Sequence, residues 1–146
     1  MKSPLHLIRT EILAIGAWAR CERDIRAVAI VGSWARGSAR SRSDIDFMFL
    51  TNRPRAHCRR RDWLARVAHR AGTRVRSRST RRHGRVWSVH AQLATRRMLE
   101  LTFAVRAWAS VAPLDSGTAQ VVDGGIAVLN DRHRLLHRLC REVFPR

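Results

Sequence analysis

Two short stretches of the chain carry residue types that suit phosphoryl chemistry. Gly32 and Ser33 follow an apolar run rich in Val and Ile, and Asp44 and Asp46 lie in a second apolar run further along. Glycine lets the backbone approach an anion closely, and a serine can donate its hydroxyl to a phosphate. Residues i and i+2 of a strand project from one face, so the two carboxylates repel each other unless a cation lies between them. The pattern indicates a phosphate-binding loop beside a divalent cation site.

Paired carboxylates favour Mg²⁺, with Mn²⁺ as the alternative, because hard oxygen ligands suit both ions. Arg36 follows Ser33 by about one helical turn, where a guanidinium can contact a phosphate. A phosphate cradle next to such a metal site is the equipment for phosphoryl or nucleotidyl transfer. Simpler interpretations stay open: Asp44 as a turn residue at a strand entry, and Arg36 as an ordinary surface residue.

The stretch from Ile30 to Leu50 resembles the DNA polymerase beta-like nucleotidyltransferase superfamily, in particular its small bacterial stand-alone domains. The residues that match its motif in order are Gly32, Ser33, Ala35, Arg36, Gly37, Ser43, Asp44 and Asp46. The resemblance extends more loosely over residues 25–136. It implies an enzyme that moves an NMP group from an NTP, with ATP expected, to an acceptor hydroxyl with the help of two Mg²⁺ ions. It also implies nucleotide binding by Gly32, Ser33, Arg36, Gly37 and Ser43.

In that superfamily a third carboxylate on a later strand completes the metal site. Carried over, Glu100 joins Asp44 and Asp46 as a catalytic metal ligand, and it is the only acid between Asp62 and Asp115. Relatives often have a second acid two residues further on, where this chain has Thr102. That departure keeps an alternative open: a catalytically weak or inactive antitoxin or scaffold that binds a partner protein or nucleic acid.

The resemblance implies either a small-molecule acceptor or a protein acceptor such as a HEPN-type toxin. The chain has 146 residues, which is short for a large helical acceptor domain. Recognition of the acceptor is therefore expected from residues 53–95, from a homodimer, or from a partner protein. His90 alternates with the apolar positions of its segment and is a further candidate for a base, although the sequence shows no partner for it.

Composition limits the other function classes. The chain has 29 Lys and Arg against 11 Asp and Glu, a net charge of +18, which predicts at least nonspecific attraction to nucleic acid. Its three cysteines are widely spaced, which fits neither a disulfide framework nor a metal clip. No apolar run is long enough to span a membrane, and no secretory signal is recognisable, so we expect a cytoplasmic protein.

Hydrophobic periodicity predicts one domain over residues 1–146, a mixed α/β fold whose central mixed sheet of about four to six strands is flanked by helices. The motif core spans residues 26–104. Ile45, Phe47 and Phe49 are expected on the buried face of their strand, and Asp44 and Asp46 on the other. The predicted helices are 4–22, 58–71 and 132–143, the predicted strands are 26–31, 44–50, 73–80, 85–94, 98–103 and 126–129, and residues 113–117 are predicted as a loop.

Overall fold

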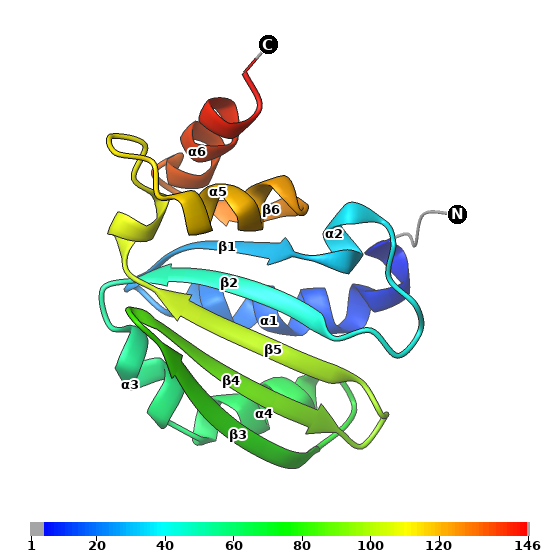
Figure 1. Cartoon of the computed structure of the whole chain (residues 1–146). Coiled ribbons are helices and arrows are strands. Elements are labelled where there is room, and N and C mark those ends of the chain that lie inside the picture. Colours follow the sequence, from blue (N-terminus) through cyan, green and yellow to red (C-terminus); the bar gives the residue numbers. More distant parts are fainter. Residues whose placement is uncertain (1–4, 146) are drawn as a thin grey trace.

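The computed structural model describes residues 5–145 and contains a six-stranded mixed sheet with helices packed on both faces (Figure 1). The strand order is β3-β4-β5-β2-β1-β6, and neighbours pair antiparallel except β2 and β5. This confirms the expected architecture. The strands are β1 (Ile25–Val31), β2 (Ile45–Thr51), β3 (Val75–His83), β4 (Val86–Leu93), β5 (Met98–Ala104) and β6 (Ile126–Asp131).

The helices differ from the predicted ones mainly at their ends. The N-terminal helix is a 3-10 turn followed by α1, and the predicted start at Ser3 and Pro4 lies outside the described residues. Within residues 5–145, no helix has the length and apolar character needed to cross a membrane. The helical elements are η1 (Leu5–Ile8), α1 (Arg9–Cys21), α2 (Ser33–Arg36), α3 (Pro54–Arg59), α4 (Asp62–Arg70), η2 (Arg106–Ala109), α5 (Ser116–Asp123) and α6 (Leu135–Val143).

Three differences have local causes. The predicted helix 58–71 is two helices, α3 and α4, and α3 starts earlier, at Pro54, because proline is well tolerated in the first turn of a helix. The segment predicted as a loop leads into α5, where the Asp115 carboxylate accepts a hydrogen bond from the Thr118 backbone N–H at 2.9 Å. The last helix begins at Leu135 rather than at residue 132, since Asp131 ends β6 and caps α6 from there by accepting from the His137 N–H at 2.9 Å.

One face of the sheet carries the main hydrophobic core. Helices α1, α3 and α4 lie against it behind the strands in Figure 1. The alternation predicted for β2 is confirmed, because Ile45, Phe47 and Phe49 are fully buried in this core. Trp18 of α1 stacks on Trp63 of α4 with ring centroids 4.1 Å apart, and this contact joins the two helices over the strands.

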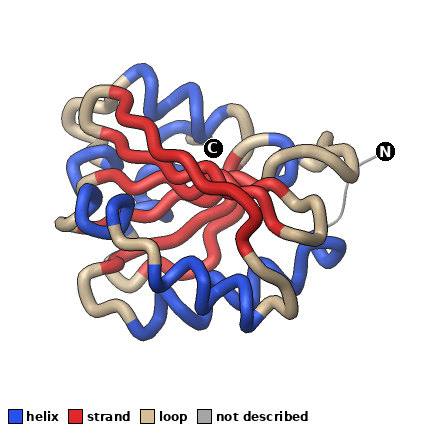
Figure 2. The backbone as a smooth tube through the Cα atoms, turned by 90° about the horizontal axis from the view of Figure 1, so that it is seen from below, coloured by secondary structure: helices blue, strands red, loops and turns tan. Residues whose placement is uncertain are grey.

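The other face is covered only in part, and this determines where a site can form. Helices α5 and α6 with η2 pack on the half formed by β1, β6 and the far end of β2, and Figure 2 shows helical segments on both sides of the strands. On the half formed by β4 and β5 this face carries polar side chains instead, and these are Ser88, His90, Gln92, Glu100 and Thr102. A polar, uncovered half-sheet therefore lies next to a covered one.

A hydrogen-bonded group on the core side joins the end of β2 to α3. The Asp24 carboxylate lies 2.6 Å from His57 Nε2 and accepts from the Thr51 hydroxyl at 2.8 Å. Burial by itself would raise the pKa of Asp24, but the hydrogen bonds from His57 and Thr51 and the charge of His57 lower it overall. The charged form of Asp24 therefore stabilises the fold.

Replacing Asp24 with Asn is expected to lower the free energy of unfolding at neutral pH by about 1–3 kcal/mol, because buried partners lose a charged acceptor. A carboxyl whose pKa is depressed by folding stabilises the protein above its unfolded pKa, near 3.8, and loses that contribution as pH falls through the folded pKa. Urea unfolding between pH 2.5 and 7 measures both effects, and the variant should show a shallower loss of stability in acid.

The control for this prediction is Asp62→Asn. Asp62 is 55% exposed and pairs with Arg60 and Arg66 at 3.6 and 3.4 Å, so its removal should cost less than about 1 kcal/mol. Equal losses of stability from the two substitutions would contradict the role given to Asp24.

Candidate active site

The loop between β1 and α2 is shaped by Gly32, which has φ of 77°. A Cβ atom at this position would lie 2.7 Å from Asp46 Oδ2, closer than carbon and oxygen can pack. Gly32 also donates its N–H to the Gly125 carbonyl at 3.2 Å, while its own carbonyl accepts from the Arg36 N–H at 2.9 Å. Glycine is required here for its backbone conformation and for the close approach of the Asp46 carboxylate.

Three residues form one row across the uncovered half of the sheet. Asp46 of β2 is paired in register with Glu100 of β5, and Glu100 is paired with His90 of β4. His90 Nε2 lies 3.3 Å from Glu100 Oε1. Asp44, just before β2, completes the group, because Asp44, His90 and Glu100 each offer one ligand atom and these atoms lie within 4.8 Å of one another. The structure thus brings together the three predicted carboxylates and adds a histidine.

The electrostatics of Asp46 match a cation site. Its Oδ1 atom is buried and has no hydrogen-bond partner among the described residues. Burial, the charge and hydrogen bond of Glu100 and the charge of Asp44 together raise the pKa of Asp46 to about 7. Carboxylates that resist ionising together are stabilised by a divalent cation, so the donor set of oxygens with one imidazole fits such an ion.

The register between β2 and β5 shows where Thr102, the position at which relatives often have a second acid, lies relative to Asp46. Glu100 lies level with Asp46, whereas Thr102 lies level with Met48, two residues further along β2. The Thr102 hydroxyl lies 3.1 Å from the Ser88 hydroxyl, so this position is taken up by a cross-strand hydrogen bond. The acid that this chain keeps is therefore the one aligned with the Asp46 carboxylate.

The remaining motif residues build the loop around the carboxylates. Gly37 ends α2 in the left-handed conformation with φ of 81°. The Ser43 hydroxyl accepts from the Arg40 N–H at 2.8 Å, which closes the turn before Asp44. Trp34 is only 2% exposed and donates its indole N–H to the Ser43 carbonyl at 3.3 Å, so it packs under the loop rather than over it.

Arg36 has contacts that fasten α2 to a distant turn. Its guanidinium donates to the Gly124 carbonyl at 2.5 Å and to the Ser38 hydroxyl at 3.0 Å. These contacts hold α2 against the start of β6, and the predicted phosphate contact of Arg36 stays a prediction. Ser33 lies at the start of α2, next to Gly32, and the predicted phosphate contact of its hydroxyl also stays a prediction.

Arg97, in the turn between β4 and β5, secures the same loop from the other side. Its Nε lies 3.2 Å from the Glu11 carboxylate of α1. The two terminal nitrogens donate to the carbonyls of Leu7, at 3.0 Å, and Ser41, at 3.3 Å. One guanidinium therefore joins the N-terminal helical segment, a hairpin turn and the loop that leads to Asp44.

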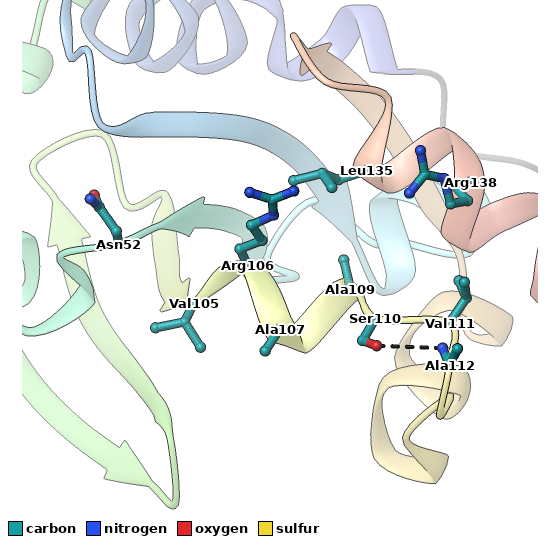
Figure 3. Close-up of a pocket in the computed structure, with 10 residues that line it drawn as sticks. All are labelled: Asn52, Val105, Arg106, Ala107, Ala109, Ser110, Val111, Ala112, Leu135 and Arg138. Carbon is teal, nitrogen blue, oxygen red and sulfur yellow. Dashed lines mark hydrogen bonds between the residues drawn. The ribbon is translucent and has the colours of Figure 1, made fainter.

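The larger cavities lie away from this row. One of about 600 Å³ is bounded by η2 and α6 at the opposite end of the parallel strands, and Figure 3 shows Arg106 and Arg138 among its lining residues. Another of about 710 Å³ lies between α1 and α4 on the core side. None of Asp44, Asp46, Glu100 or His90 lines either cavity, so the row lies on an open surface beside the β1–α2 loop.

His90 is the residue that sequence reasoning undervalued. Its alternation in β4 placed it correctly on the polar face, but its contact with Glu100 depends on the register between β4 and β5. That register is set by tertiary pairing and by the turn between the strands, which no local pattern encodes.

The chain matches the family model described as the nucleotidyltransferase domain over residues 17–107. This span contains β1 to β5, the β1–α2 loop and all four residues of the group on the uncovered face. A search among curated proteins found no match. Since the matched span is well over half of the chain, the protein belongs to the nucleotidyltransferase domain family.

Proposed function

We propose that this protein is a metal-dependent nucleotidyltransferase that moves an NMP group from an NTP, ATP in the first instance, to an acceptor hydroxyl. The observation that carries the proposal is the aligned row of Asp46, Glu100 and His90, with Asp44 beside it, next to the β1–α2 loop. Family membership supports nucleotidyl transfer in general. The roles of single residues, the metal and the acceptor are parts of the proposal.

Asp44, Asp46 and Glu100 would hold the divalent ions, two Mg²⁺ or alternatively Mn²⁺. The unpartnered Oδ1 of Asp46 and the pKa of about 7 caused by its burial, Glu100 and Asp44 support this assignment. Such ions, when bound, polarise the α-phosphate and stabilise the attacking and leaving oxygens. His90 contributes by holding the Glu100 carboxylate in orientation, because ligand carboxylates work best with a second contact that fixes them.

The β1–α2 loop is proposed to bind the triphosphate through Gly32 and Ser33, with Arg36 as a further phosphate contact. Gly37 and Ser43 would set the shape of the loop through the turn contacts described above. In the transfer step the acceptor hydroxyl releases its proton to water, and its oxygen bonds to the α-phosphorus. The bond from that phosphorus to the β-phosphate oxygen breaks, and pyrophosphate leaves in line with the attack.

The acceptor would approach over the uncovered half-sheet. This polar face continues from Glu100 across His90 to Ser79 of β3, and a small molecule or a protein hydroxyl could be presented there. A protein acceptor of the HEPN type, or recognition by a second copy of the chain, also fits an open face.

The test is to incubate the purified protein with each of the four NTPs, labelled at the α-phosphate, in Mg²⁺ or Mn²⁺. Label transfer to a protein or small-molecule hydroxyl and pyrophosphate release should appear together, and EDTA should abolish both. Calorimetric titration with a non-hydrolysable ATP analogue measures binding separately. Tight binding without release across a panel of acceptors would contradict the enzyme and favour a binding-only scaffold.

Replacing His90 with Asn is expected to reduce the transfer rate by about 10- to 100-fold while leaving the fold intact, because Glu100 loses the group that orients it. The Kd for Mn²⁺, measured by electron paramagnetic resonance, should rise by a similar factor. Ser79→Ala is the matched control, since Ser79 is the cross-strand neighbour of His90 on β3 and is exposed. An unchanged rate and Kd in the His90 variant would remove it from the site.

A further inference from the structure

A hollow of about 270 Å³ on the other face of the sheet has an unusual concentration of positive charge. Arg55 and Arg59 of α3 and Arg82 of β3 line it together with Trp87 of β4. The indole of Trp87 lies beneath two guanidinium groups, with the Cζ atoms of Arg55 and Arg82 at 5.7 and 4.9 Å from its ring centroid. Stacking on an aromatic ring holds a guanidinium in place while leaving its N–H edge free to donate.

These three arginines have no acidic partner. In the part of the chain that the structure describes, no ion pair involves any of them. The acid nearest to them in sequence, Asp62, is already paired with Arg60 and Arg66. Three like charges around one hollow repel one another, and an anion with several oxygen acceptors removes that cost.

The hollow is separate from the proposed nucleotide site. Trp87 and Arg82 are paired in register and Trp87 packs against the main core, whereas the Asp46, Glu100 and His90 row projects from the opposite face. The sheet itself lies between the two. The charge is therefore not explained by a triphosphate bound at the β1–α2 loop.

The charge also continues beyond the hollow. β3 is the edge strand of the sheet, and further exposed arginines adjoin the hollow residues in the chain, namely Arg60 and Arg61 after α3 and Arg85 in the β3–β4 turn. A single phosphate would occupy the hollow and leave these arginines unused. A polymer with regularly spaced phosphates would use the hollow and its surroundings together.

We propose that this arginine hollow binds the phosphodiester backbone of a nucleic-acid strand. The proposal goes beyond nucleotidyl transfer and does not depend on it, since none of its residues belongs to the carboxylate site. Trp87 acts as the platform that orients Arg55 and Arg82, and Arg59 completes the set of donors. Because backbone contacts carry no sequence information, binding should depend on salt more than on sequence.

The experiment measures binding of a fluorescent 12-nucleotide RNA by anisotropy at several salt concentrations. The variant Arg55→Ala, Arg59→Ala, Arg82→Ala removes three charges at the hollow, and the control Arg9→Ala, Arg23→Ala, Arg141→Ala removes three exposed charges elsewhere. We expect affinity at low salt to fall by about 30-fold or more in the first and by less than about 3-fold in the second. The slope of log K against log salt should decrease by about 2 in the first only.

Additional variants and ligands test the proposal further. Lysines at the same three positions should restore most of the salt slope but not the full affinity, because lysine keeps the charge and loses the fork and the stacking. If the alanine variant fails to fold, Arg59→Glu alone, at an exposed position, replaces it. A DNA 12-mer and inorganic polyphosphate identify the source of the phosphates. Equal losses in the two triple variants, or preference for polyphosphate over both nucleic acids, would overturn the proposal.

Discussion

Replacing Asp46 with Asn is expected to lower the rate of nucleotidyl transfer by about three orders of magnitude. Asp46 lies between the β1–α2 loop and Glu100, and in the proposed function its carboxylate would hold the metal next to the bound triphosphate. Asn keeps the size of the side chain but removes the charge that would balance a divalent cation. Pyrophosphate release at saturating NTP and Mg²⁺ measures the loss.

The same substitution is expected to stabilise the metal-free protein. The pKa of Asp46 is raised by folding from 3.8 to about 7, so its ionisation opposes folding increasingly as pH rises through that range, and fully above it. At pH 8 the variant should be more stable than the wild type by about 1–2 kcal/mol, and the difference should shrink toward pH 4. Added Mg²⁺ should raise the melting temperature of the wild type only.

Asp123→Asn serves as the control for both effects, because Asp123 is an exposed carboxylate at the end of α5. It should change stability by less than about 0.5 kcal/mol at any of these pH values and leave transfer unchanged. Wild-type activity in the Asp46 variant, or a lower stability than the wild type at pH 8, would refute the assignment of Asp46 to the metal.

Replacing Gly32 with Ala is expected to reduce transfer by about 100-fold and to destabilise the fold by about 2–3 kcal/mol. Two effects combine in this variant. The new Cβ would lie 2.7 Å from Asp46 Oδ2, so either the loop or the carboxylate must move. The backbone at φ of 77° is also strained for any residue with a Cβ. Transfer kinetics and urea unfolding measure the two losses.

Gly72→Ala separates backbone strain from displacement of the carboxylate. Gly72 follows α4, has the same φ of 77°, and a Cβ there would meet no atom within 4 Å. This control should lose about 1–2 kcal/mol of stability and retain full transfer. A Gly72 variant that loses activity as severely as the Gly32 variant would show that instability, rather than contact with Asp46, explains the effect.

Strand positions and their faces could be predicted from the sequence because alternation is a local property. The alternation of side chains along this strand predicts that Glu100 lies on the face away from Leu99 and Leu101. In the structure those two leucines are in the core and Glu100 is on the other face. The helix α5 could not be predicted in this way. Its sequence from Ser116 to Asp123 has a glycine and β-branched residues instead of a clear apolar stripe, and it is held by the Asp115 cap and by packing of Val122.

Local sequence patterns could not predict contacts between residues that are far apart in the chain. Arg36 meets the carbonyl of Gly124, 88 residues away, and His90 meets Glu100 only through strand register. Motif spacing predicted which carboxylates would gather. It did not predict that a histidine would join them, or that Arg36 of the motif would be engaged by a distant turn.

The three contacts of Arg97 bear on which N-terminal residues a shortened version of the protein must include. This guanidinium contacts the Glu11 carboxylate and the carbonyls of Leu7 and Ser41. The loop that leads to Asp44 is therefore positioned by the N-terminal helical segment, which contributes no residue to the carboxylate group. Leu7 and Glu11 thus support the loop that leads to the proposed metal ligand Asp44. We therefore expect a fragment that begins at residue 17, where the family match begins, to lose the support of this loop.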